Sequence, residues 1–234
     1  MQEVEFDYKE HSYYLYNRKL NYKNGFYMEK VSKRVESYVK HLNYGKVFTF
    51  ETVRFYSKNA ARDTITHALK KEMDNNRIIH IRKGLYAKPE LSRFGSIPVS
   101  PEKVVSAMAR EFRANISPSG ASALNALGLT TQLPMSVSYI STKRISSFSY
   151  SSGEVKIRYS QAFEKAVSCF RGTEKSEKEN AILLWISLEY LGKQEAFQKR
   201  NALKAIYSGF SEKTRNKFIK SLGRKQSWAE SLFK

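Results

Sequence analysis

The order of short elements in residues 26–88 constrains the fold of this chain more than any other feature. Apolar side chains recur at helical spacing and predict a first helix over about residues 27–42. A short β-prone stretch, residues 47–50, then leads into a second short helix at about residues 51–56. The first half of this region is therefore expected to form a helix, a strand and another helix.

A third helix and a hairpin are predicted to complete the region. Residues 57–59 form a turn with capping side chains, and a helix over about residues 60–73 follows. Two short strands, 77–82 and 85–87, are joined by Lys83 and Gly84, and a glycine suits a tight turn. The buried stripe of the third helix is expected to contain Ala61, Ile65, Ala68, Leu69 and Met73. This order of elements is that of a winged helix-turn-helix domain.

The third helix is predicted to be a recognition helix. Such a helix is buried on one side and polar on the other, so that its polar side enters the major groove. We expect the polar side to present Asn59, Arg62, Thr66 and Lys70. Contacts with phosphate or with the minor groove are expected from Lys58, Arg82 and Lys83. Some winged domains bind protein or RNA instead, so the pattern leaves that alternative open.

The charge of the chain favours a polyanionic partner. It has 41 Lys and Arg residues against 22 Asp and Glu residues, a formal net charge of +19. Fifteen of the bases and seven of the acids lie in residues 26–94. A second basic block covers residues 161–234, where lysine-rich helix faces exposed to solvent are an equally good explanation. Double-stranded operator DNA is therefore the expected partner of the first block.

Several classes of protein are excluded by the composition. No apolar run approaches the roughly 18–20 residues of a membrane helix. The polar first residues do not resemble a secretory signal, and a cytoplasmic location is expected. The single cysteine, Cys169, excludes an internal disulfide framework and a zinc site with several cysteines. We expect no cofactor and no metal.

No catalytic constellation is evident, and we expect the protein not to be an enzyme. Residues 172–176 lack the glycine and lysine spacing of a phosphate-binding loop. Glu154 and Lys156 match half of a metal-dependent nuclease site, which also needs an upstream carboxylate to share the metal. All three aspartates lie at or before Asp74. A nuclease that uses Glu154 is kept as an alternative.

Two segments resemble AbiEi-type antitoxins. Residues 82–89 read RKGLYAKP, which looks like the wing of that family, and residues 116–134 read ISPSGASALNALGLTTQLP, which is similar to its most distinctive segment. With the winged region, the resemblance covers about residues 30–160. It implies an antitoxin of a bicistronic abortive-infection system, active in phage defence. Such a protein neutralises a nucleotidyltransferase-like toxin, by contact or by opposing its effect, and represses its own promoter.

The second half of the chain offers further contact residues. Ser119, Thr131 and Gln132 lie in the antitoxin-like segment. The alternative interpretation is that this whole segment forms the core of a small second domain. Residues 155–159 alternate apolar and basic side chains, so one face of a strand is expected to present Lys156 and Arg158. These five residues are candidate contacts with the toxin or with a second stretch of DNA, or ordinary exposed residues.

The sequence therefore predicts an α+β protein in three segments. Residues 1–25 form a Tyr-rich arm, which packs on its own domain, stacks on nucleic-acid bases or sets the oligomeric state. Residues 26–94 form the winged helix-turn-helix, and residues 95–234 a small α/β domain with a helical tail from about residue 161. The alternative to an antitoxin is a stand-alone transcriptional regulator whose C-terminal domain senses a partner.

Overall fold

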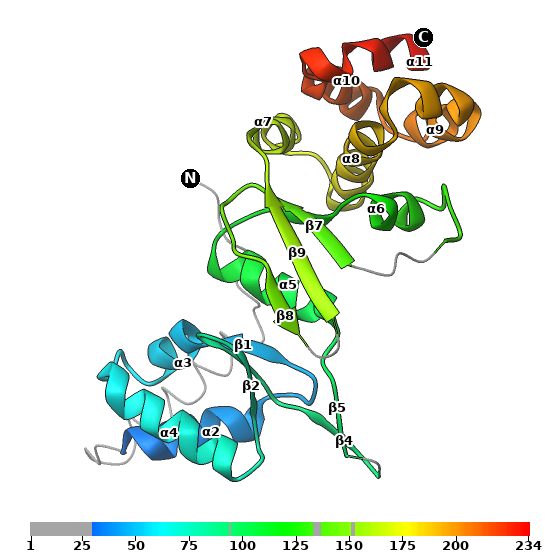
Figure 1. Cartoon of the computed structure of the whole chain (residues 1–234). Coiled ribbons are helices and arrows are strands. Elements are labelled where there is room, and N and C mark those ends of the chain that lie inside the picture. Colours follow the sequence, from blue (N-terminus) through cyan, green and yellow to red (C-terminus); the bar gives the residue numbers. More distant parts are fainter. Residues whose placement is uncertain (1–29, 94, 133–136, 151–152) are drawn as a thin grey trace.

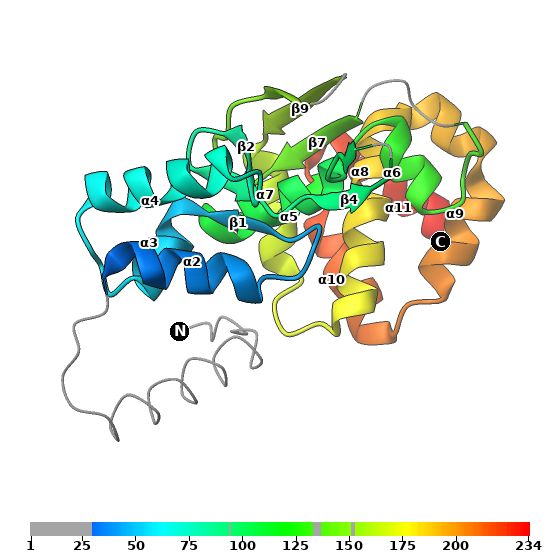
Figure 2. The ribbon, with the colours of Figure 1, turned by 90° about the horizontal axis from the view of Figure 1, so that it is seen from below.

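The computed structural model describes residues 30–93, 95–132, 137–150 and 153–234, so the predicted arm at residues 1–25 lies outside the described residues. The chain is arranged along one long axis, with a winged region at one end, a four-stranded sheet in the middle and helices at the other end (Figure 1). The view from below shows α2, α3 and α4 grouped away from α8, α9 and α11 (Figure 2). The α+β architecture predicted from the sequence is confirmed.

The first region has the topology of a winged helix-turn-helix domain. Its three strands form an antiparallel sheet in the order β1-β3-β2, so that the last strand pairs with the first. The two strands of the wing, β2 and β3, are joined by Lys83 and Gly84. Its elements, in chain order, are α2 (Val31–His41), β1 (Val47–Thr49), α3 (Phe50–Tyr56), α4 (Arg62–Asp74), β2 (Ile79–Arg82) and β3 (Leu85–Ala87).

The apolar stripes predicted for the helices form one core. Val35 and Val39 of α2 are buried against Ile65 and Leu69 of α4, as their helical spacing indicated. The prediction for Ala61 was wrong: this residue is exposed and precedes the first turn of α4, which begins at Arg62. The predicted cap at residues 57–59 was also wrong, because the residue before α4 makes no capping bond through its side chain.

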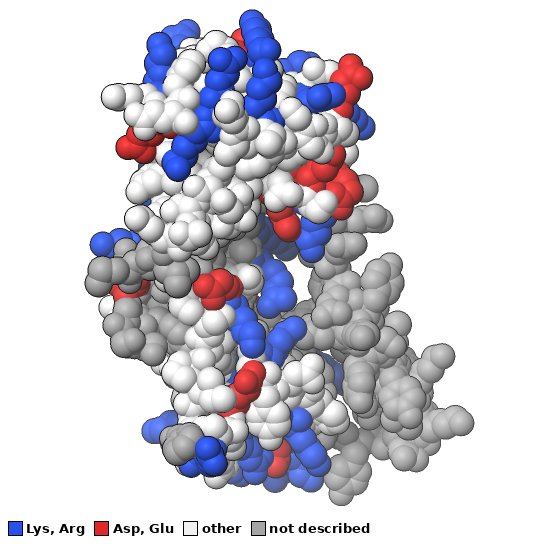
Figure 3. All heavy atoms as spheres, turned by 90° about the vertical axis from the view of Figure 1, so that its right-hand side faces the viewer, with Lys and Arg blue, Asp and Glu red and all other residues white. Residues whose placement is uncertain are grey.

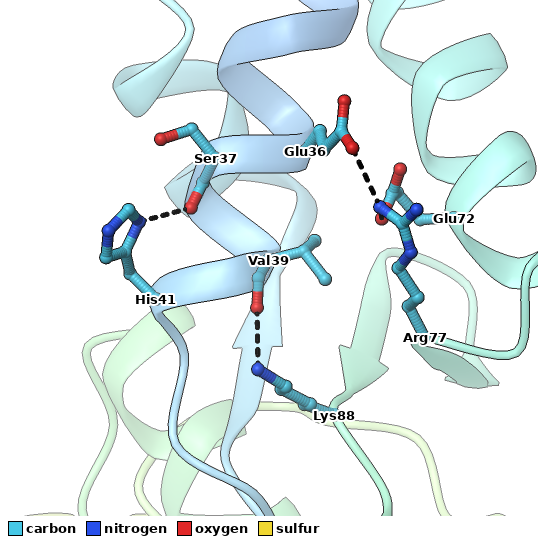
Figure 4. Close-up of polar contacts among 7 residues, drawn as sticks. All are labelled: Glu36, Ser37, Val39, His41, Glu72, Arg77 and Lys88. Atoms are coloured by element: carbon cyan, nitrogen blue, oxygen red, sulfur yellow. Dashed lines mark hydrogen bonds and ion pairs between the residues drawn. The ribbon is translucent and has the colours of Figure 1, made fainter.

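Polar contacts fasten the winged region at two points (Figure 4). The Arg77 guanidinium bridges α2 and α4, at 3.0 Å from Glu36 and 3.3 Å from the buried Glu72. The Lys88 ammonium donates to three carbonyl groups at the C-terminal end of α2, including that of Val39 at 3.1 Å. The last carbonyls of a helix have few backbone partners, here, among the described residues, only the Leu42 N–H on the Val39 carbonyl, and a cation satisfies them. Burial nevertheless lowers the pKa of Lys88.

The other face of the three-stranded sheet is covered by the second region. A short hairpin of β4 (Glu90–Ser92) and β5 (Gly95–Ile97) leads into α5 (Pro101–Glu111). The predicted domain boundary, between residues 94 and 95, thus falls inside this hairpin. Leu85 and Ala87 of β3 share a core with Val104 and Met108 of α5, and the same core reaches the four-stranded sheet. The two regions are therefore continuous through α5.

The four-stranded sheet is mixed, in the order β6-β7-β9-β8. The strands β7 and β9 are parallel, with Ser138 paired with Lys156, and the outer strands are antiparallel to them. The alternation predicted in residues 155–159 is confirmed, because Val155 and Ile157 are buried while Lys156 and Arg158 are exposed. The strands and one short helix are β6 (Ile116–Pro118), α6 (Ala121–Ala126), β7 (Val137–Ser141), β8 (Phe148–Tyr150) and β9 (Gly153–Tyr159).

The remainder is helical from Gln161, as expected. In the longest helix, α8, residues 181–188 are apolar and buried on nearly all sides, and Trp185 donates an indole N–H to the Ser221 carbonyl at 3.1 Å. Phe233 stacks on Tyr207 with 4.4 Å between ring centroids, so the terminal aromatics pack on their own helices. The elements are α7 (Gln161–Cys169), α8 (Lys175–Gln198), α9 (Arg200–Ser208), α10 (Glu212–Ser221), a 3-10 turn η1 (Arg224–Ala229) and α11 (Glu230–Phe233). Within the described ranges, none of the helices is long and apolar enough to cross a membrane.

Candidate nucleic-acid interface and a groove on the second sheet

The outer side of α4 is exposed along its length. Arg62, Thr66 and Lys70 follow one another at intervals of four residues and are all exposed, with Arg62 on the flank of the buried stripe that contains Ile65 and Leu69. The Thr66 hydroxyl donates to the Arg62 carbonyl at 2.9 Å, so only its oxygen is left to accept a bond from a ligand. The structure thus places three of the predicted recognition residues on one side of one helix.

The turn before α4 has an unusual backbone. Lys58 and Asn59 lie in succession in the left-handed region, with φ angles of 58° and 55°. Asparagine tolerates this region, whereas a lysine there is strained by its Cβ. Asn59 is exposed and lies in this turn, as the sequence predicted, and α4 begins three residues later at Arg62. The turn therefore presents both side chains at the N-terminal end of α4.

Arg62 is held at that same end by aromatic rings. Its guanidinium carbon lies 5.0 Å from the centre of the Phe50 ring at the start of α3. Its charge also acts on Tyr86 of β3, where burial raises the pKa of the phenol and the nearby Arg62 partly counteracts the rise. Arg62 is still exposed, so the Phe50 ring orients its guanidinium without covering it.

The two neighbouring cations of the wing, Arg82 and Lys83, have different surroundings. Gly84 adopts a φ of 76° at the tip, and the preceding Lys83 is exposed. Arg82 instead turns toward the second region, where its guanidinium donates to the Ser146 carbonyl at 3.3 Å and lies 4.9 Å from the centre of the Phe148 ring. The sequence predicted both cations as DNA contacts. In the structure the Arg82 guanidinium is instead engaged in contacts within the protein, whereas Lys83 is exposed.

The exposed cations of the winged region carry unopposed charge. Among the described residues, no ion pair joins Lys58, Arg62, Lys70 or Lys83 to an acidic side chain. Lys and Arg side chains also lie at both ends of the face shown in Figure 3, over the C-terminal helices at the top and toward the winged end at the bottom. A surface of this kind attracts phosphate groups and loses part of that attraction in salt.

A second concave site lies on the four-stranded sheet, beside α8. Its volume is about 620 Å³. The walls come from the turn before α6, from β7 and β9, from the residue before β8 and from α8. The lining residues are Ser119, Gly120, Ser138, Tyr139, Ser147, Glu154, Lys156, Ile157, Arg158, Ile186, Glu189 and Tyr190. We call this site the sheet groove.

Three of the predicted contact residues of the second half meet in the sheet groove, namely Ser119, Lys156 and Arg158. Thr131 and Gln132 do not line it; both lie in the loop after α6, where Gln132 is exposed. The sequence analysis missed Glu189 and Tyr190, which α8 brings to the groove. Their signal was present, since they are two polar residues inside the apolar run 181–191.

Polar contacts organise the lining of the sheet groove. The Ser119 hydroxyl donates to the Ser138 hydroxyl at 3.2 Å, and the latter donates back to the Ser119 carbonyl. Arg158 pairs with Glu189 at 3.0 Å, and Lys156 lies 3.6 Å from Glu154. Within the described parts of the chain, no three His, Cys, Asp or Glu side chains are close enough together to hold a metal ion.

Comparisons with known proteins give a family model and a similar solved structure. The model of a family of unknown function, DUF6088, matches residues 34–208. The crystal structure of the RV2827C protein from Mycobacterium tuberculosis is similar, with a TM-score of 0.41 and 15% sequence identity, over 88% of this chain and 82% of that one. No curated protein matches the chain.

Proposed function

We propose that this chain, which belongs to the DUF6088 family, is a non-enzymatic antitoxin that also represses its own operon by binding promoter DNA. One observation carries the DNA-binding half of the proposal. Arg62, Thr66 and Lys70 form an exposed row on α4, the helix that occupies the position of a recognition helix in a winged domain.

The flanking cations support a duplex as the ligand of α4. A helix in the major groove brings the turn before it and the wing beside it close to the phosphate backbones. Lys58 lies in that turn and Lys83 at the tip of the wing, and both are exposed. Arg62 or Lys70 would then contact base edges, where a cationic side chain favours guanine.

The antitoxin half of the proposal rests on the resemblance of residues 82–89 and 116–134 to AbiEi-type antitoxins. In the structure the second of these segments includes β6 and α6 and borders the sheet groove. It therefore lies apart from the exposed side of α4. This separation suits a protein that binds DNA with one region and acts on a toxin with another.

Binding to the DNA upstream of its own gene tests the first half. Fluorescence anisotropy compares that duplex with an unrelated one of equal length, for the full chain and for Arg62→Ala, Lys70→Ala and Lys83→Ala. We expect Arg62→Ala or Lys70→Ala to weaken binding to the upstream duplex by about 1–3 kcal/mol. Either variant should also reduce the preference of the protein for the upstream duplex over the unrelated one. Lys83→Ala should weaken binding to both duplexes equally.

The matched control for this experiment is Lys165→Ala, which removes an exposed lysine from α7, outside the winged region. Its affinity should equal that of the wild type. Unchanged affinity and salt dependence in the three winged-region variants would refute the assignment of α4 and the wing. An equal loss in Lys165→Ala would show attraction to the overall charge without a defined interface.

The second candidate function is a stand-alone regulator that senses a partner. The sheet groove favours it, because a winged domain with a concave site on a second domain needs no toxin. The two functions differ in one consequence. An antitoxin relieves the toxicity of the product of an adjoining reading frame, whereas a stand-alone regulator does not.

A further inference from the structure

The sheet groove combines groups of opposite charge, hydroxyl groups and one exposed aromatic ring. Its floor is the polar face of β7 and β9, and the C-terminal half of α8 forms one side. About 620 Å³ lies within the roughly 300–1,000 Å³ of small-molecule sites. None of this chemistry is used by the proposed contact between α4 and DNA, so a ligand of the groove would be a separate partner of the chain.

The cations of the groove are suited to one phosphate group. Lys156 and Arg158 alternate with Ile157 on β9, so their side chains leave the same face of the sheet about 7 Å apart. Both side chains are more than half exposed. Arg158 contacts Glu189 through one nitrogen, and the guanidinium has further N–H donors for an anion.

The acceptors in the groove favour a ligand that carries hydrogen-bond donors as well as a negative charge. Glu154 and Glu189 stand beside the two cations, and the Ser119 oxygen has acceptor capacity because its hydrogen is donated to Ser138. A phosphate backbone offers no hydrogen-bond donors to these oxygens. Sugar hydroxyls and base amino groups do, and a carboxylate commonly accepts from ribose hydroxyls in nucleotide sites.

Tyr190 supplies the aromatic surface. Its side chain is 55% exposed, and among the described residues its hydroxyl has no hydrogen-bond partner. The ring lies against Gly120, where an added Cβ would be 3.5 Å from it. Gly120 has a φ of 61° and a ψ of −138°, a conformation open essentially to glycine alone. The strand-to-helix turn therefore comes close to one edge of the ring, and the exposed part of the ring is open for stacking.

We propose that the sheet groove binds one nucleoside monophosphate unit. The phosphate lies on Lys156 and Arg158, the base stacks on Tyr190, and the sugar or base donors reach Glu189 and the Ser119 oxygen. A free mononucleotide and the end of a single strand of nucleic acid present this same unit. Duplex DNA does not, because its bases are paired and stacked. The inference is independent of the function proposed for α4.

Isothermal titration of the full chain with AMP, GMP, CMP and UMP tests the inference. Adenosine and inorganic phosphate serve as half-ligands, and a short single-stranded oligonucleotide is titrated separately. We expect at least one mononucleotide to bind with a Kd below about 1 mM, and each half-ligand to bind at least about tenfold more weakly. Tighter binding of the oligonucleotide, lost in the same variants, would identify a strand end as the natural source.

Two variants and a control locate the site. Arg158→Gln removes the phosphate contact and Tyr190→Leu removes the stacking ring, and each should weaken binding by about tenfold or more. Lys165→Gln, outside the groove, should bind as the wild type does. Unchanged thermal unfolding verifies that each variant is folded, which is expected because Arg158 and Tyr190 are exposed. Absence of saturable binding, or equal affinity in all variants, would overturn the proposal.

Discussion

Lys83 and Arg82 are adjacent cations at the wing, and the structure predicts that they affect DNA binding differently. Lys83 is exposed at the tip, whereas the Arg82 guanidinium contacts the Ser146 carbonyl and the Phe148 ring. Each phosphate neutralised by a side chain contributes about 0.9 to the slope of log K against log salt. Lys83→Ala should therefore reduce the slope by about 0.9, and the pair Lys58→Ala, Lys83→Ala by about 1.8. Arg82→Ala should leave the slope nearly unchanged.

The assay is anisotropy with a labelled duplex at four salt concentrations between about 50 and 200 mM, where one contact changes the affinity by about three- to fourfold. Arg82→Ala should act on stability instead. It removes a cation–π contact and a hydrogen bond between the two regions, about 1 kcal/mol of unfolding free energy in urea. An equal fall of the slope for Arg82→Ala and Lys83→Ala, or no fall for either, would refute the reasoning.

Three further predictions concern stability. Lys58 has a left-handed backbone, so Lys58→Gly should be more stable than Lys58→Ala by about 1 kcal/mol in urea unfolding. Both variants should lose the same DNA affinity, and equal stability of the two would contradict the backbone strain. Leu69→Ala should cost about 2–5 kcal/mol in the same assay, because Leu69 is fully buried, and a cost below about 1 kcal/mol would contradict the packing of α4. Hydrogen bonds from Thr214 and Ser211 lower the pKa of Glu177, so this carboxylate stabilises the fold above its ordinary pKa of 4.5, and the effect is lost as pH falls through the lower pKa of the folded state. The melting temperature of wild type should exceed that of Glu177→Gln at pH 7, and the difference should shrink below pH 4.5; a constant difference would contradict the charge effect.

The winged region could be predicted from the sequence because its signals are local. The periodicity of α4 placed Ile65 and Leu69 in the core and Lys70 outside, and the glycine at the wing marked the hairpin. The turn at residues 57–59 was predicted, but its left-handed backbone was not, because the left-handed residues are Lys58 and Asn59 and not glycine. A cap expected at these residues placed the start of the helix at about residue 60, two residues before its observed start at Arg62.

The candidate sites depended more on tertiary contacts. Alternation along β9 was sufficient to place Lys156 and Arg158 on one face of the sheet. One wall of the sheet groove comes from α8, about thirty residues later, and no local pattern pairs Arg158 with Glu189. The inward turn of Arg82 likewise depends on Phe148, which lies in another sheet. Sequence patterns therefore identified the basic residues but not which of them the protein uses internally.

Growth on co-expression with the adjoining reading frame tests the central claim most directly. The full chain, expressed from an unrelated promoter, is compared with the double variant Arg62→Ala, Lys70→Ala, since removal of residues 1–94 would expose the core shared with α5. The antitoxin function predicts that the neighbouring product arrests growth alone, that the wild type restores growth, and that the double variant restores it while failing to repress the native promoter. A harmless neighbour, or arrest that the fully expressed chain does not relieve, would contradict the antitoxin function.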